Sequence, residues 1–152
     1  VAKYGKDTAF FSTNCSMQEP LIRSVLEGGA IYPQQCCPSP YHGYPAALNI
    51  DVSGHEGDIQ YMLNSVGTVL KEYGQESRMS TWGVAVNMIE AGVKYAIEFL
   101  EGNTEGRVDE DVLFPIIDKI AKGGTVVSTY EENGVPIDNF YLILCDYYDF
   151  SK

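Results

Sequence analysis

The sequence contains no long hydrophobic run and no excess of basic residues. Its apolar stretches fall short of the roughly 18 consecutive residues that indicate a transmembrane helix, so none is predicted. Ten Lys and Arg residues stand against 21 Asp and Glu residues, which gives a net charge of −11. Because neutralising phosphates requires a basic surface, we expect that no nucleic acid contacts this segment.

The sequence also has neither an initiator Met nor an N-terminal signal peptide. It opens with Val-Ala-Lys-Tyr-Gly, which is typical of the end of a helix, so we expect the chain to be part of a longer protein. Hydrophobic residues make up 45% of its 152 residues, which is enough for a real core and excludes a disordered composition. The length fits a single domain over residues 1–152.

Cysteine is scarce, and the four thiols exclude a disulfide scaffold. Cys15, Cys36, Cys37 and Cys145 allow three pairings, among which the sequence does not choose. Adjacent side chains point in different directions along an extended chain, so Cys36 and Cys37 are not expected to pair with each other. No C-x-x-C or zinc-ribbon spacing occurs, and we predict neither a metal nor another cofactor.

Short β-prone runs alternate with amphipathic helical patterns over most of the chain. Strands are predicted at residues 8–12, 30–32 and 78–82. Helices are predicted between Ser16 and Gly28, with a Ser16–Glu19 capping box, and at residues 59–73, 86–100 and 109–122, the last ending at Gly123-Gly124. This alternation predicts an α/β fold, a three-layer sandwich with a mainly parallel sheet and helices on both faces. The loops at the carboxyl edge of that sheet are then the default ligand site.

The C-terminal part is predicted to be β-structure. Residues 125–130 form a β-prone run that leads into a turn signal at residues 131–134. Residues 140–145 form an unbroken apolar run, which predicts a strand buried on both faces.

The segment 33–58 is rich in Pro and Gly and too long for an ordinary connection, so it is either functional or disordered. Its aromatic content argues against disorder. The densest set of special side chains lies here: Cys36, Cys37, Tyr41, His42 and Tyr44.

Four interpretations of this set remain open. It can be a packed loop with inert thiols, or a ligand-binding loop in which rings stack on the ligand and His42 donates a hydrogen bond. It can also hold a Cys nucleophile with His42 as base, although no oxyanion-hole motif accompanies it. The fourth interpretation is a soft-metal site, with Cys36 or Cys37, His42 and Cys15 as ligands.

Polar and aromatic side chains also mark the ends of the predicted strands. Thr13 and Asn14 follow the first strand and either bind a polar ligand or cap the next helix. Trp82 ends the third strand, where its ring either meets a ligand or packs in the core. Asn87 starts the following helix, as its cap or as a ligand contact.

The remaining polar residues suggest no chemistry. His55 lies in a turn and is expected to be exposed, without the second His that a metalloprotease helix needs. The acidic groups at residues 109–111 and 131–132 are predicted to be solvated surface. No Gly-rich phosphate loop opens a helix, and no catalytic residue is assigned.

Several strings resemble a known group of proteins. They are Tyr4–Cys15, Met17–Pro20, Gln35–Pro45 with its unusual Cys-Cys-Pro-Ser-Pro-Tyr-His-Gly, and Asp138–Phe140. On these strings the chain resembles an uncharacterised family of predicted bacterial lipoproteins with a type I periplasmic-binding-protein-like fold. The resemblance implies that the chain is the C-terminal half of a two-lobed protein whose N-terminal lobe is missing. It also implies that residues 84–122 hold crossover helices that belong to the other lobe.

Three functions follow as hypotheses. The first is the ligand-binding lobe of an extracytoplasmic solute-binding lipoprotein, anchored through an upstream lipidated residue and serving a membrane transporter. Its ligand is a small polar or planar molecule, and the expected contacts are Thr13, Asn14, Cys37, Tyr41, His42, Trp82 and Asn87. The second is the effector-sensing domain of a cytoplasmic transcription regulator of the same fold. The third is a thiol- or metal-dependent enzyme built on residues 33–45.

Overall fold

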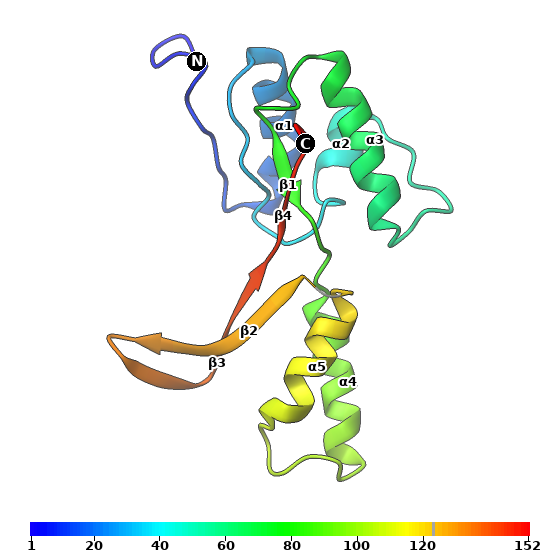
Figure 1. The fold of residues 1–152 in the computed structure, drawn as a ribbon, viewed down its shortest axis with the longest axis vertical. Helices are drawn as coiled ribbons and strands as arrows, with labels where there is room; N and C mark the ends of the chain where they lie inside the picture. Colours follow the sequence, from blue (N-terminus) through cyan, green and yellow to red (C-terminus); the bar gives the residue numbers. More distant parts are fainter. Residues whose placement is uncertain (123) are drawn as a thin grey trace. The chain divides into compact units, whose positions relative to one another are not determined.

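The computed structural model describes residues 1–122 and 124–152, and for residues 138 and 139 the backbone only. The helix end predicted at Gly123 lies outside the described residues. The chain divides into two compact units (Figure 1). Unit 1 comprises Val1–Ala85 and Tyr147–Lys152, and unit 2 comprises Val86–Asp146. Among the described helices, none combines the length and apolar composition that crossing a bilayer requires.

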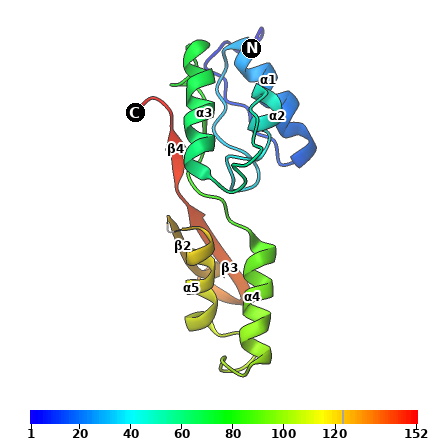
Figure 2. The same ribbon diagram turned by 90° about the vertical axis from the view of Figure 1, so that its right-hand side faces the viewer.

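Unit 1 consists of helices around a small strand pair. Its elements are the 3-10 helix η1 (Cys15–Met17), α1 (Gln18–Gly28), α2 (Tyr44–Leu48), α3 (Ile59–Glu72), β1 (Ser80–Trp82) and β4 (Tyr147–Asp149). β4 was not predicted; it pairs antiparallel with β1, with Thr81 opposite Tyr148, and runs beside α3 (Figure 2). The predicted helices of this unit are confirmed, and the segment 33–58 contains the additional short helix α2.

The core of unit 1 is built from the apolar faces of α1 and α3. Residues at helical spacing from both helices are buried, and they pack around the rings of Tyr32 and Tyr44, which meet edge to face at 5.9 Å. The buried cluster is Ile22, Val25, Leu26, Ala30, Tyr32, Tyr44, Ala47, Leu48, Met62, Val66, Leu70 and Met79.

Parallel pairing in unit 1 is limited to two isolated bridges, Ala9 with Ile31 and Tyr32 with Met79. The named strands pair antiparallel, β1 with β4 and β2 with β3. The prediction of a mainly parallel sheet is therefore wrong for the described residues, whereas the mixed α/β class is confirmed. The parallel segments are too short to form a sheet. After Tyr32, Pro33 has no N–H to donate, so the hydrogen-bonded ladder stops there. The run 8–12 is also no buried strand, since Phe11 is 53% exposed.

Unit 2 pairs two helices with a β-hairpin. α4 (Met88–Leu100) and α5 (Glu110–Ile120) precede β2 (Thr125–Glu132) and β3 (Val135–Cys145). The predicted turn is confirmed: Asn133 and Gly134 have φ of 53° and 77°, as a two-residue hairpin loop requires. Pro115 lies inside α5.

One face of the hairpin is covered and the other is open. Phe114 of α5 meets Tyr141 edge to face at 5.2 Å, whereas Leu142 and Leu144 on the opposite face are 44% and 56% exposed. The prediction that residues 140–145 are buried on both faces is therefore wrong for this chain. A continuous apolar run does not reveal whether a second layer is present.

Candidate functional site

Three chain segments run parallel in unit 1 and end at one edge. Residues 8–10 lie beside 31–32, which lie beside 79–80, with the amide of Phe10 donating to Ile31 O at 2.9 Å and that of Ser80 to Tyr32 O at 3.0 Å. The carboxyl ends of neighbouring parallel segments lie at the same edge. The loops that follow the first two segments carry Cys15 and Cys36, and Trp82 ends β1, which continues the third segment; we call this region the carboxyl edge.

Four side chains from this region form a tight group, which we call the thiol–imidazole cluster: Cys15, Cys36, Cys37 and His42. Their Sγ and Nε2 atoms all lie within 4.8 Å of one another. Cys15 is exposed, and the other three are half-buried. Three thiols and an imidazole are ligands that a soft divalent metal accepts.

The local backbone explains why both adjacent thiols join the cluster. Residues 36–38 form bends, and the amide of Ser39 turns back to donate to Cys37 O at 2.8 Å. The expectation that Cys36 and Cys37 point apart assumed an extended chain, which these bends replace. Their Sγ atoms lie 3.7 Å from each other.

The surroundings of Cys36 and Cys37 favour the protonated thiols, which are poor nucleophiles. Burial first, and then the neighbouring thiols of Cys15 and Cys36, raise the pKa of Cys37 to about 12. Burial likewise raises the pKa of Cys36. Since the thiolate is the reactive form, this environment works against a Cys nucleophile paired with His42.

Hydrogen bonds at Gln35 connect the second loop of the carboxyl edge to the end of β1. The indole Nε1 of Trp82 donates to Gln35 O at 2.9 Å, and Thr81 Oγ1 donates to Gln35 Oε1 at 2.9 Å. The Gln35 side chain is fully buried, and within the described part of the chain its Nε2 has no hydrogen-bond partner. A bound polar group or a water can satisfy this donor. Sequence reasoning missed Gln35, because a single glutamine carries no local signature.

The other predicted site residues have structural contacts. Asn14 caps η1, with its Oδ1 accepting from the amide of Ser16 at 3.0 Å, and Asn87 caps α4, with its Oδ1 accepting from Glu90 N at 3.1 Å. Thr13 is exposed beside Asn14. Asn87 belongs to unit 2, so the described geometry does not group it with the residues of unit 1.

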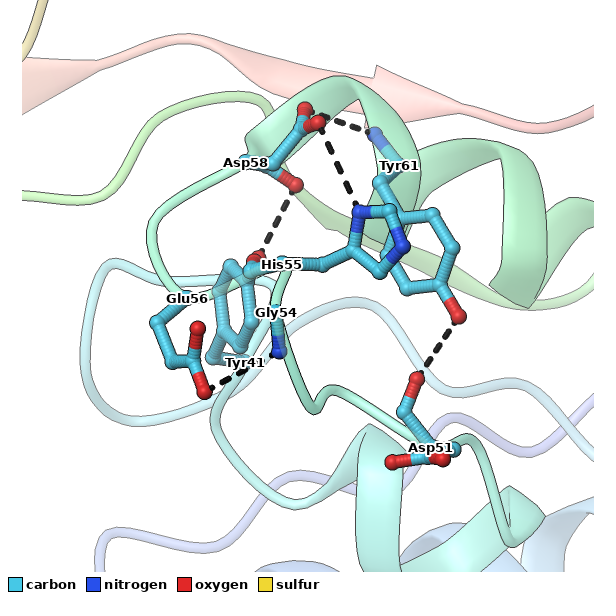
Figure 3. A network of polar contacts seen from close by, with 7 residues as sticks. All are labelled: Tyr41, Asp51, Gly54, His55, Glu56, Asp58 and Tyr61. Atoms are coloured by element: carbon cyan, nitrogen blue, oxygen red, sulfur yellow. Dashed lines mark hydrogen bonds and ion pairs between the residues drawn. The ribbon is translucent and has the colours of Figure 1, made fainter.

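Tyr41 anchors a neighbouring loop (Figure 3). Its hydroxyl donates to the carbonyls of His55 and Asp58, the latter at 2.9 Å. The His55 ring stacks on Tyr61 at 3.7 Å and is exposed, as predicted. Tyr61 in turn donates to Asp51 O at 2.6 Å. The network holds residues 51–58 against α3, so the Tyr41 hydroxyl is engaged within the protein.

A separate hollow of about 510 Å³ lies along α3, where the C-terminal residues Phe150–Lys152 border it. None of the predicted ligand residues lines it. The candidate site therefore remains the carboxyl edge with the thiol–imidazole cluster.

The fold is similar to that of a solved structure. A candidate transcriptional regulator from Clostridium difficile 630 matches 97% of this chain with a TM-score of 0.70 and 21% sequence identity. The chain spans 42% of the length of that protein. The similarity supports an α/β fold and says nothing by itself about activity.

Residues 1–80, more than half of the chain, match the model of a family described as "Protein of unknown function (DUF3798)". The chain belongs to this family. None of the curated proteins matches it.

Proposed function

We propose that this chain is one half of a two-lobed protein that binds a small polar or planar molecule, and that it serves as the effector-sensing part of a transcription regulator. The observation that carries the proposal is the meeting of two loops and the end of β1 at the carboxyl edge. Such an edge is where α/β proteins bind their ligands. The fold similarity to a candidate regulator supports the sensing role.

The residues at this edge offer a suitable set of contacts. Trp82 is half-buried and provides an aromatic ring, while Gln35 Nε2 provides a buried donor without a partner within the described part of the chain. Thr13 and Asn14 add exposed polar groups at the end of the first segment. A small molecule with a planar face and a few hydrogen-bonding groups suits this combination.

The open apolar surfaces of unit 2 support the second part of the proposal, that a further lobe exists. Ile89, Val93, Ile97 and Leu100 follow helical spacing along α4 and are between 48% and 81% exposed. A stripe of this kind is normally covered. We propose that the remainder of the protein covers it, so that the helices within 84–122 belong to the other lobe and additional strands complete a parallel sheet.

An extracytoplasmic solute-binding lipoprotein that serves a membrane transporter is a second candidate. The strings around Cys36 and Tyr41 that resemble predicted bacterial lipoproteins favour it. It shares the ligand site with the regulator and differs in its compartment. Fractionation of cells expressing the full-length protein separates the two: a membrane-bound, lipidated form favours the lipoprotein, and a cytoplasmic form that binds DNA through another segment favours the regulator.

Ligand binding is tested on the full-length protein by native mass spectrometry and by thermal shift with a panel of sugars, nucleosides and amino acids. We expect a copurified mass that is lost on denaturation, or a raised melting temperature, since a ligand at 100 times its Kd stabilises by about 2.7 kcal/mol. Trp82→Ala should abolish the effect, while the control Tyr4→Ala, at a ring that is 72% exposed, should not. A native mass equal to that of the protein alone, together with an unchanged melting temperature across the panel, contradicts the proposal.

A further inference from the structure

The three sulfurs of the thiol–imidazole cluster, and the Cys36–His42 pair, have the spacings of ligands in a tetrahedral metal site. Cys15 Sγ lies 3.7 Å from Cys36 Sγ and 3.5 Å from Cys37 Sγ, and the latter two are 3.7 Å apart. His42 Nε2 lies 3.5 Å from Cys36 Sγ. In a tetrahedron with Zn–S of about 2.3 Å and Zn–N of about 2.0–2.1 Å, ligand sulfurs are about 3.8 Å apart and sulfur and nitrogen are about 3.6 Å apart.

We propose that Cys15, Cys36, Cys37 and His42 bind one Zn²⁺ ion per chain. Three thiolates and one imidazole form a complete ligand set of the kind found in structural zinc sites, which leave no open position for a substrate. The inference concerns a metal rather than the small molecule proposed above, and it holds whether or not that molecule binds.

The arrangement of the thiols favours a metal over inert packing and over a disulfide. Inert thiols are usually buried in apolar surroundings, whereas Cys15 is exposed and Cys36 and Cys37 are half-buried. The three sulfurs form a nearly equilateral triangle, with every pair in contact. A disulfide joins two of three thiols and leaves both the third and His42 without a role, while a metal uses all four groups.

The metal would crosslink the first two loops of the carboxyl edge. Cys15 follows the first parallel segment, Cys36 and Cys37 follow the second, and His42 stands just before α2. Zn²⁺ binding to these positions crosslinks stretches 21 to 27 residues apart in sequence and orders the loops that flank Trp82 and Gln35.

The spacing of the ligands gives only a weak signal in the sequence, where a soft-metal site with Cys36 or Cys37, His42 and Cys15 is one of four open interpretations. The set reads C-x20-C-C-x4-H, in which the only close pair of cysteines is adjacent rather than separated by two residues. The bends at residues 36–38 bring both thiols to one side. We therefore revise the expectation that the chain holds no metal.

Co²⁺ titration of the reduced full chain, followed by visible spectroscopy and competition with Zn²⁺, tests the proposal. One Co²⁺ should bind per chain with the strong absorption of a tetrahedral thiolate complex, and Zn²⁺ should displace it. Cys15→Ser should weaken binding on the order of 100-fold or more, since even partners outside the ligand set contribute 10–100-fold. Cys15 is exposed, so this change removes a ligand without disturbing the core.

Matched controls are available in the same chain. Cys145→Ser, in unit 2, and His55→Gln, at an exposed ring, should leave the spectrum and the affinity unchanged. His42→Gln should keep thiolate-to-cobalt absorption, weaken binding and shift the tetrahedral d–d bands, because an oxygen ligand then replaces the imidazole nitrogen. Equal losses in Cys15→Ser and Cys145→Ser, or Co²⁺ bound without thiolate absorption, would overturn the proposal. A disulfide from Cys15 to Cys36 or Cys37, found by peptide mapping after the thiols of the native protein are blocked, would also overturn it.

Discussion

Gln18 joins the loop before η1 to the second parallel segment of unit 1. Its Nε2 donates to Ser12 O at 2.9 Å and to Asn14 O at 3.2 Å, and its Oε1 accepts from the hydroxyl of Tyr32 at 2.5 Å. The Gln18 side chain is fully buried. A buried polar group that is fully hydrogen-bonded holds its neighbours in one arrangement. Gln18 therefore fixes the loop that carries Cys15.

Tyr32→Phe should destabilise unit 1 by about 1–3 kcal/mol, because it leaves the buried Gln18 Oε1 without its donor. Chemical denaturation followed by circular dichroism measures the change. The control Tyr4→Phe, at an exposed ring, should stay within about 0.5 kcal/mol of the parent. Equal midpoints for the two variants would show that the Tyr32–Gln18 bond contributes nothing.

Local signals allowed the sequence to identify some residue roles and not others. Asn14 and Asn87 were weighed as caps because a cap depends on the residue and its neighbours along the chain, and both are caps. Gln35 was missed because its partners come from a distant segment, and Gln18 because its bond to Tyr32 depends on how α1 packs. The sequence leaves the thiol–imidazole cluster as one of four open interpretations, since proximity of Cys15 to Cys36 depends on how two loops fold together.

At the scale of elements, the backbone at Gly43, just before α2, lies in close contact with α1. Its φ is +86°, a conformation that glycine favours. A Cβ at this position would lie 2.8 Å from Gln18 Cβ and 3.0 Å from Ile22 Cδ1. The close approach sets α2 against α1 and determines where His42 lies.

Gly43→Ala should cost the roughly 1–2 kcal/mol of a left-handed residue and a further 1–3 kcal/mol for the overpacked contact. Gly54→Ala is the matched control, because Gly54 has a φ of +76° and open space around it. The difference between their urea midpoints isolates the packing contribution. Equal destabilisation of both variants would contradict the close approach at Gly43.

Helices were more predictable than strands in this chain. The helix predicted at residues 59–73 closely matches α3. Hydrogen bonding within a helix is local, and all the residues of its apolar face lie in one continuous segment of sequence. Strand pairing requires a partner elsewhere, so neither β4 nor its antiparallel pairing with β1 was foreseen. The turn at Asn133-Gly134 was predicted, because it is again a local signal, whereas the pairing of β2 with β3 was not.

At the scale of the whole molecule, the exposed stripe of α4 predicts self-association of the isolated chain. The double variant Ile89→Glu with Leu100→Glu, at side chains that are both 81% exposed, should shift the chain toward monomer in light scattering after gel filtration. Its stability should change by about 0.5 kcal/mol or less per site. Ala91→Glu on the same helix, at a side chain only 3% exposed, should instead destabilise unit 2. Unchanged association of the double variant would exclude the stripe as the contact.

The interrupted path of unit 1 has a consequence for its biosynthesis. β1 ends at Trp82, but its partner strand begins at Tyr147, after the whole of unit 2. A ribosome adding about 5–20 residues per second needs several seconds to translate the intervening segment. Throughout that time the backbone N–H and C=O groups of β1 that later bond to β4 are unpaired, and they can pair with other chains. In the nascent chain, β1 therefore pairs with β4 only after residues 147–149 have left the exit tunnel, and truncation before Tyr147 would remove the partner strand of β1.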